Sequence, residues 1–491
     1  MDAYHENMSP QRHRPYLHQV LVFVAGVYLL AWCGALLLVV VPVVEWISTS
    51  TLTPVQVLQM GSGMLLLWIT FPRHRPFQPP GPQLHLRDHP RLQALLSEIA
   101  EQTHQPLPDE VYLMLDNNAW VQESTFLGFQ GKRRMGLGLS LMQQLTVEEF
   151  RAVLAHEFGH YHAGDTRMVH LVHGARHAIL RILHAQNEGH TPMLHRPFLW
   201  YGRLFLQMTQ RMSRRQEYAA DRIAAQLTSP EIMVQALKKV HDLGATFEAY
   251  WQIEVIPVLN LGYQPPILQG YQHYLQGSGL QHHLQDLSEE PEDPYDTHPS
   301  FVCRAEALRN LPPTHLKDLT PAALTLLEHP EVLETLVLQH FGGEDASRFQ
   351  AILWTEVGEK VWVKIWQEQL SLYQGAFWDL TLRTLAGRLD QYGVKHQLLH
   401  KLQPWNEPED EQAWHNLRVQ VLLALHRQGW TVQTLPGDPV VCQKQDCSLR
   451  VFEDVWNMRS GQLLPAHWLK DLWNAGVDVD APLTTSKAFM A

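Results

Sequence analysis

Cysteine is scarce in this sequence, with four residues in 491. Such a chain has no disulfide framework, and its cysteine usage suits a reducing compartment. Cys442 and Cys447 have four residues between them and no second pair to complete a zinc ribbon. Two ordinary thiols are therefore a better interpretation than half of a metal site.

Basic residues are also in short supply. The 38 Lys and Arg residues face 50 Asp and Glu residues, which gives a formal net charge of −12. Phosphate binding needs an excess of cations, so nucleic acid is not expected as a partner. With 45% hydrophobic residues, the chain can fill at least one large core and two or three domains.

Charge is absent from two long stretches near the N-terminus. Val20 to Val44 is uncharged over 25 residues, and no charge appears between Glu45 and Arg73. At about 1.5 Å per residue the first stretch spans a bilayer, and it is too long for a signal peptide and lacks a cleavage site. The second, 55–71, favours another span over a membrane-lying or buried helix.

The basic residues flank this hairpin on one side only. Arg12 and Arg14 precede the first stretch, Arg73 and Arg75 follow the second, and the loop between the stretches offers only Glu45. The positive-inside bias then places both ends of the hairpin, and everything after Arg73, in the cytosol. The sequence thus predicts a multi-pass protein of the cell membrane (plasma or inner) whose main domain is cytoplasmic.

The rest of the chain is mainly α in pattern, with a small β-sheet. Six prolines crowd the segment after the hairpin, which predicts an extended stalk. Strands are expected at Val111–Leu115 and Met135–Leu139, and Thr146 with Glu149 forms a capping-box signal that begins a helix. The expected organisation is a membrane hairpin over 1–75 (helices about 20–44 and 55–71), a stalk over 76–90, a domain over 91–310, and a mostly helical region of unknown role over 311–491.

One segment concentrates metal-binding residue types. In VLAHEFGHYHAGD, His156, Glu157 and His160 form H-E-x-x-H. On a helix the two imidazoles project from one face, as two ligands of one zinc ion require, and Glu157 points beside the metal, where it can take a proton from water. In a chain with 29 histidines this spacing arises by accident roughly one time in ten.

A later segment supplies the carboxylate that catalytic zinc needs. In RRQEYAAD, Glu217 and Asp221 stand at i and i+4, so one can coordinate while the other orients an imidazole from behind. His162 lies about 200° around the helix from His160 and is read as structural. A further histidine stripe favours a solvated or membrane-facing polar face over a second metal; it consists of His170, His173, His177 and His184.

These motifs resemble the zinc metalloproteases of the HtpX and CAAX prenyl endopeptidase type, metallopeptidase family forty-eight. Four segments carry the resemblance: NNAW at 117–120, GLGLSLMQQLTVEEFRAVLAHEFGHYHAGDTR, RRQEYAAD and DTHPSFVCRAEAL. The resemblance implies a zincin-like α+β catalytic domain that binds one zinc ion. The roles that it implies are zinc ligands for His156, His160 and Glu217, general base for Glu157, support of the site for Asp165 and Asp221, and a place near the substrate for Asn118 and His298, with His298 stabilising the oxyanion.

The sequence departs from this family in the interval after the metal-binding helix. HtpX-type proteins usually have further spanning helices there, whereas charges here interrupt the segments 168–183 and 198–212. We therefore expect a membrane-anchored zinc endopeptidase that binds a protein or peptide substrate along an edge strand, Met135–Leu139, with loose specificity. Two alternatives are a membrane-tethered scaffold with a vestigial site, and a CAAX-type processing protease, for which the chain has too few spans.

Overall fold

The computed structural model describes residues 14–70, 77–126, 129–162, 213–277, 299–313, 318–346, 348–390, 402 and 410–484. Over these residues the protein is mainly helical, with a four-stranded, a three-stranded and a two-stranded sheet, which confirms the expectation of a mainly α protein with little β-structure. The chain divides into two compact units. The first comprises Met1–Met114, Asn118–His241 and Pro291–Glu328, and the second comprises Leu115–Asn117, Asp242–Glu290 and His329–Ala491.

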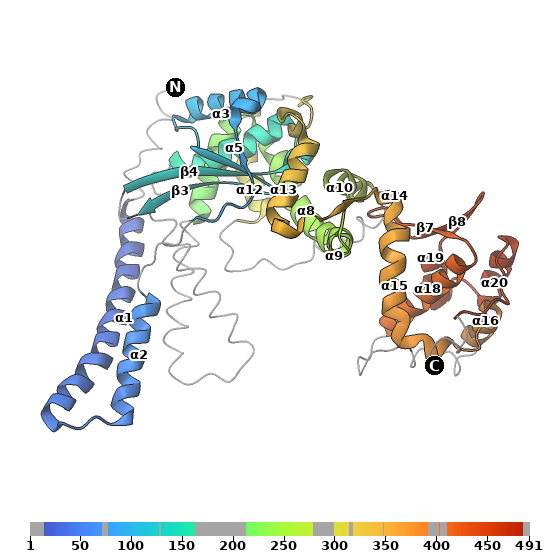
Figure 1. Ribbon diagram of the computed structural model, residues 1–491. Helices are drawn as coiled ribbons and strands as arrows, with labels where there is room; N and C mark the ends of the chain where they lie inside the picture. Colours follow the sequence, from blue (N-terminus) through green and yellow to red (C-terminus); the bar gives the residue numbers. More distant parts are fainter. Residues whose placement is uncertain are drawn as a thin grey trace. The chain divides into compact units, whose positions relative to one another are not determined.

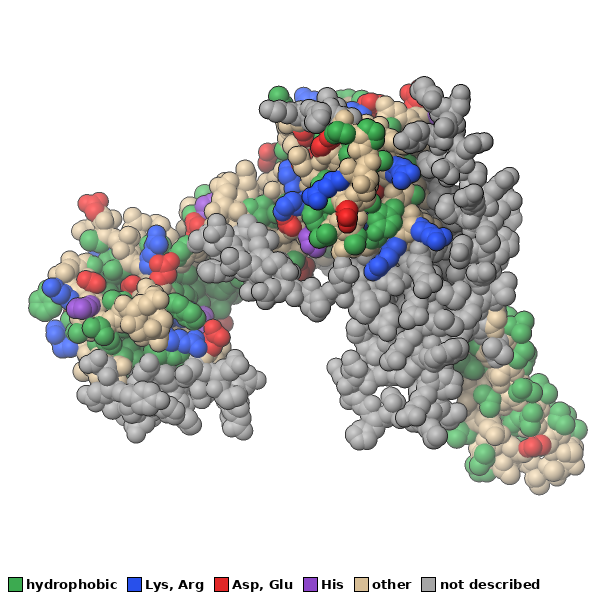
Figure 2. Space-filling view, turned by 180° about the vertical axis from the view of Figure 1, so that it is seen from behind, with side chains coloured by type: hydrophobic (Ala, Val, Ile, Leu, Met, Phe, Trp, Pro, Cys, Tyr) green, Lys and Arg blue, Asp and Glu red, His purple; other side chains and the backbone are tan. Residues whose placement is uncertain are grey.

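Two apolar helices begin the first unit, α1 (Arg14–Thr49) and α2 (Pro54–Thr70), which lie side by side in Figure 1. Gly63 makes their contact close, because a Cβ there would stand 2.7 Å from the carbonyl oxygen of Ala35. Most other large side chains of the pair are exposed, and hydrophobic groups cover the visible face of the hairpin (Figure 2). Among the described residues, one helical stretch, Ala31–Thr49, is long and apolar enough to cross a membrane.

The segment expected as a stalk is partly folded into the first unit. Residues 71–76 lie outside the described residues, but β1 (Gln83–Leu84) pairs antiparallel with β2, and a short 3-10 turn, η3 (Leu86–Asp88), follows it. Leu84 is buried, and Gly81 lies so close to the backbone of Leu113 that a side chain would not fit. The prediction of an extended spacer as far as residue 90 is therefore wrong, since the dense prolines end before this strand begins.

The sheet of the first unit has the order β1-β2-β4-β3, with β2 (Glu110–Met114), β3 (Ala119–Phe126) and β4 (Phe129–Gly138). β2 and β4 are parallel, and β3 and β4 are antiparallel. The predicted strand around Met135 is thus an interior strand, and β3 is the edge. The glycines of the Met135 strand do not make room for a substrate. A Cβ on Gly136 would stand 2.4 Å from the indole of Trp120, so this glycine makes room for that ring.

Two helices, α3 (Pro90–Thr103) and α5 (Val147–His162), lie on one side of this sheet (Figure 1). A salt bridge of 2.6 Å between Arg151 and Glu98 joins them. The predicted capping box is present: Glu149 N–H donates to Thr146 Oγ1 at 3.1 Å, and Thr146 N–H donates to the Glu149 carboxylate at 2.9 Å. α5 therefore begins at a defined point, which sets which of its faces meets the core.

The remaining elements of the first unit surround α5. They are α4 (Leu139–Gln144), a helix over 213–227, the first half of α8 (Pro230–Tyr250), α12 (Phe301–Arg309) and η5 (Ala323–Leu326). The backbones of Leu145 and Val147 pair with residues 321–323. Lys239 of α8 binds the Glu149 carboxylate at 2.6 Å. The start of α5 is thus held by two separate parts of the chain.

The second unit holds the C-terminal third of the chain. Its elements before residue 380 are η4 (Trp251–Val255), α9 (Ile256–Asn260), β5 (Tyr263–Gln264), α10 (Ile267–Gln276), α13 (Pro330–Ala346), β6 (Gln350–Ala351), α14 (Trp354–Val357), η6 (Gly358–Trp362), α15 (Val363–Leu370) and η7 (Ser371–Phe377). Its later elements are α16 (Leu382–Asp390), α18 (Asp410–Arg427), β7 (Thr431–Gln433), β8 (Val441–Lys444), β9 (Cys447–Leu449), α19 (Val451–Arg459) and α20 (Pro465–Asn474). A hydrophobic core around Leu417, Trp430 and Trp468 joins α15 to α20, so this region is a folded domain.

Candidate metal centre

The histidine motif lies on the last two turns of α5, as predicted. His156 is buried, and the Nε2 atoms of His156 and His160 are 3.1 Å apart. The two rings meet edge to face, with centroids 4.7 Å apart. One ligand atom each from His156, Glu157 and His160 can be chosen so that all lie within 4.8 Å of one another. The motif therefore gathers three metal-binding groups at one point on the surface of a single helix.

The helix over 213–227 brings a carboxylate to the same point. Glu217 is buried, and its two oxygens lie 3.5 Å from His156 Nε2 and 3.7 Å from His160 Nε2. Asp221 is on the other side of the first ring, with Oδ1 2.9 Å from His156 Nδ1. The spacing alone left open which acid faces the imidazole pair, and the family resemblance implied Glu217 as the ligand. In the structure Glu217 faces it, and Asp221 holds the distal nitrogen.

A glycine between the two histidines allows the helices to come this close. A Cβ on Gly159 would stand 3.0 Å from the Cα and 3.2 Å from the Cβ of Ala220. Such separations are below the ordinary carbon contact of about 3.5–4.0 Å, so only glycine fits without a shift. Ala220 follows Glu217 by one turn of its helix, and the close contact therefore fixes the distance between Glu217 and the histidines.

Arg304 of α12 belongs to the centre, although sequence reasoning did not single it out. Its Nε and Nη2 donate to the two oxygens of Asp221 at 2.8 and 2.6 Å, and its Nη1 lies 3.3 Å from Glu217. Such a bidentate fork fixes both acids in position. The only signal in the sequence was the place of Arg304 within the segment DTHPSFVCRAEAL, 83 positions after Asp221.

The electrostatics of the centre favour a cation. Burial alone would lower the pKa of His156, but Asp221 and Glu217 raise it to about 9. Burial would likewise raise the pKa of Asp221, yet Arg304 and His156 hold it below its ordinary value. When His156 is neutral, as a metal ligand must be, the carboxylates of Glu157, Glu217 and Asp221 face one guanidinium, which leaves two negative charges for a divalent ion to balance.

The donor atoms also fit zinc in number, type and spacing. In a tetrahedral site with zinc bonds of about 2.1 Å, neighbouring donor atoms are about 3.4 Å apart. The two Nε2 atoms are 3.1 Å apart, and they lie 3.5 Å (His156) and 3.7 Å (His160) from the two oxygens of the Glu217 carboxylate. Two imidazoles and one carboxylate are a catalytic donor set, which keeps a fourth position for water or substrate. The residues present thus suit one zinc ion.

The remaining predicted residues are placed as follows. Asn118 is exposed at the start of the edge strand β3, where its carbonyl oxygen accepts a hydrogen bond from Gly138 N–H at 2.9 Å. Asp165, His298, the histidine stripe 170–184 and the segments 168–183 and 198–212 lie outside the described residues. Cys442 and Cys447 are free thiols, and burial raises the pKa of Cys442 to about 12.

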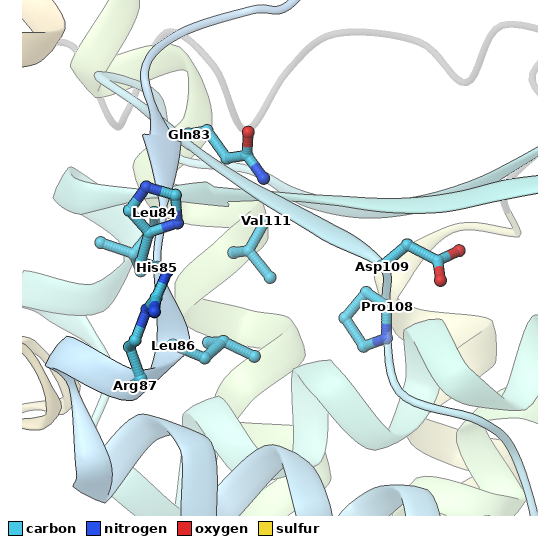
Figure 3. A pocket seen from close by; sticks show the side chains of 8 residues that line it. All are labelled: Gln83, Leu84, His85, Leu86, Arg87, Pro108, Asp109 and Val111. Atoms are coloured by element: carbon cyan, nitrogen blue, oxygen red, sulfur yellow. The ribbon is translucent and has the colours of Figure 1, made fainter.

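A separate small pocket of about 170 Å³ lies at the other edge of the same sheet (Figure 3). Val111 and Leu86 form its middle, with His85 and Arg87 on one side and Asp109 on the other. These residues come from β1, η3 and the start of β2. Since β1 and β3 are opposite edges of the sheet, the pocket is not part of the β3 edge.

An H-E-x-x-H helix faced by a glutamate from a second helix is the arrangement of a metallopeptidase centre. Comparison with known families agrees. Residues 86–312, which include the whole centre, match the model of peptidase family M48. No curated protein and no solved structure matches the chain.

Proposed function

We propose that this protein is a membrane-anchored, zinc-dependent endopeptidase of the cell membrane whose active site faces the cytoplasm. The observation that carries the proposal is the meeting of His156, His160 and Glu217 within 3.7 Å, with Glu157 beside them. Zinc, held by these two imidazoles and the Glu217 carboxylate, would lower the pKa of a water molecule toward about 7 and polarise a peptide carbonyl.

Three side chains of the protein then transfer a proton or hold the groups of the site in place. Glu157 takes a proton from the attacking water and passes it to the amine nitrogen that leaves when the peptide bond breaks. Asp221 accepts a hydrogen bond from Nδ1–H of His156, which fixes the tautomer in which Nε2 is free to coordinate. Arg304 binds Asp221 and Glu217, which keeps both carboxylates oriented toward the two histidines.

The free edge of β3 is the proposed binding site for the backbone of the substrate. One side of β3 pairs with β4, and within the described sheet its other side has no neighbouring strand. An extended peptide can add to such an edge through main-chain hydrogen bonds, which read few side chains, so specificity is expected to be loose. Unfolded segments of membrane or misfolded proteins are the expected substrates.

The helices α1 and α2 are the proposed anchor. The apolar side chains of Leu37, Ile47, Leu58 and Trp68 are 62–72% exposed. Apolar surface of this extent is unfavourable in water and suits a bilayer. Labelling of single introduced cysteines with a membrane-impermeant reagent tests the orientation. Labelling of residues after Arg75 from outside the cell would overturn the cytoplasmic assignment.

Two substitutions test the chemistry. Glu157→Gln is expected to keep bound zinc and lose casein cleavage, because only the proton carrier is changed. Glu217→Ala is expected to lose zinc as well, as measured by metal analysis of the purified protein. Glu148→Gln, on the same helix, is the matched control and should cleave as the parent does. If Glu157→Gln cleaved casein at the parent rate, Glu157 would not be the general base. If the parent protein did not cleave casein, the alternative of a membrane-tethered scaffold with a vestigial site would be favoured.

A further inference from the structure

The C-terminal domain contains a cavity of about 500 Å³ between α18, α19 and the loop that leads into β8. Arg418 contributes from α18, Pro439 and Val440 from the loop, and Phe452 and Trp456 from α19. Both helices are packed into the domain core, where their residues Leu417 and Val455 are fully buried. A volume of this size accommodates a small ligand or one to two residues of a peptide.

Arg418 is the cation of this cavity. Its guanidinium stands 5.5 Å from the centre of the Phe452 ring, and its Nε is shielded from solvent without a hydrogen bond to any described residue. Burial and the neighbouring Arg459 lower the pKa of Arg418, and Glu411 offsets this in part. A half-buried guanidinium with donors to spare is best stabilised by a carboxylate, which it can bind through two parallel hydrogen bonds.

The acids that line the cavity are engaged elsewhere. Asp438 binds His273 Nε2 at 2.8 Å, and Glu453 faces Arg450 at 3.4 Å. Glu411, the acid whose charge reaches Arg418, lies 3.8 Å from Arg459. Among the described residues none of these three acids forms a hydrogen bond or an ion pair with Arg418, so its guanidinium is available to the anion of a ligand.

The wall of the cavity next to Arg418 is aromatic and apolar. The Trp456 side chain is 48% exposed at the rim, and Phe452 packs on Trp366 with ring centres 5.6 Å apart. Pro439 and Val440 complete this wall. A ligand therefore needs a carboxylate at one end and an apolar side chain within a few ångströms of it. The last residue of a polypeptide carries both groups on one Cα atom.

We propose that this cavity binds the free C-terminal carboxylate of a polypeptide whose last side chain is aromatic or aliphatic, with Arg418 holding the carboxylate and Phe452 and Trp456 holding the side chain. The site stands on the C-terminal domain alone and does not depend on the metal centre. In an endopeptidase it would retain unfolded chains, or the new C-termini that cleavage creates.

Fluorescence anisotropy of short peptides labelled at the N-terminus tests the proposal on the full-length protein carrying Glu157→Gln, so that the probe stays intact. A peptide that ends in Phe with a free carboxylate is expected to bind about tenfold or more tighter than the same peptide with a C-terminal amide. A third peptide, amidated and with an internal Asp beside Phe, separates a chain end from an acidic side chain. Equal binding of the acid and the amide, or of the third peptide and the free acid, would overturn the proposal.

Variants locate the binding. Arg418→Gln is expected to weaken binding of the free acid about tenfold and to abolish its preference over the amide, whereas Arg388→Gln, an exposed arginine of α16, should change neither. Trp456→Ala tests the apolar end and should keep the fold, because the side chain is half exposed. It should reduce binding of a peptide ending in Phe more than one ending in Gly. Unchanged binding by both variants, with unchanged thermal melts, would place the peptide elsewhere.

Discussion

The contact between Gly159 and Ala220 gives the sharpest test of how the metal centre is built. In Gly159→Ala the new methyl group would lie 3.0 Å from the Cα and 3.2 Å from the Cβ of Ala220. Relief of this overlap needs a separation of the two helices by several tenths of an ångström, toward the ordinary contact of about 3.5–4.0 Å. Glu217 is one turn from Ala220, so its carboxylate moves away from both imidazoles by a similar amount.

Metal sites tolerate about 0.2 Å of error in ligand distance, so this displacement is expected to matter more for zinc than for folding. We expect zinc affinity to fall roughly 10- to 100-fold, and overpacking to cost about 1–3 kcal/mol of stability. A competition titration against a chromophoric chelator measures the affinity, and casein cleavage at saturating zinc should recover much of the parent rate.

Two further variants separate helix spacing from helix propensity. Gly244→Ala is the matched control, because a Cβ at this position of α8 would meet no atom within 4 Å. It should leave zinc binding unchanged. Adding Ala220→Gly to Gly159→Ala removes one of the two close contacts and should restore part of the affinity. Parent-like zinc binding by Gly159→Ala would refute the idea that this contact sets the position of Glu217.

Three other predictions concern charges. Arg304→Ala should lower stability by about 3 kcal/mol and weaken zinc binding, since it leaves two buried carboxylates with less positive charge; Arg304→Lys should recover part of both, by thermal melts and chelator competition. Asp221→Asn should weaken zinc binding about 10- to 100-fold at neutral pH, because the partner of the His156 ring loses its charge. Glu254→Gln should stabilise the protein at pH 8 but not at pH 5, as measured by melts at both values.

The sign of the Glu254 effect follows from its environment. Burial raises the pKa of this carboxyl from 4.5 to about 7, and a hydrogen bond from Gly437 N–H offsets this only in part. The folded protein then holds a proton that the unfolded chain releases, so stability falls between about pH 4.5 and pH 7 and stays lower above it. The loss is up to about 3 kcal/mol, and Gln avoids it. Glu248→Gln, which removes an exposed acid six positions earlier in the chain, is the control for the loss of one negative charge.

Local patterns predicted the parts of the site that lie within one helix turn of each other. The i, i+4 spacing of His156 and His160 and of Glu217 and Asp221 places each pair on one helix face, and the structure has those helices. Arg304 was missed because it reaches Asp221 from a separate helix, 83 positions later, and no local pattern encodes that contact.

The edge position of the strand Met135–Leu139 was predicted wrongly for a similar reason. Met135–Leu139 has the composition of a strand, but its place in the sheet depends on pairing with β2 and β3, which are distant in sequence or joined by a turn. The glycine at 136 is compatible with either an approaching peptide or a large neighbouring ring, and the ring of Trp120 occupies that space. Composition alone does not distinguish the two.

The fork of Arg304 on Asp221 and Glu217 has a consequence for synthesis on the ribosome. The metal-binding helices emerge first, and their acids crowd together without the guanidinium until α12 has been made and has docked. A nascent or truncated chain that ends before this helix would therefore carry both histidines and yet hold zinc poorly. Late arrival of one arginine would thus delay metal binding until the whole domain has been made.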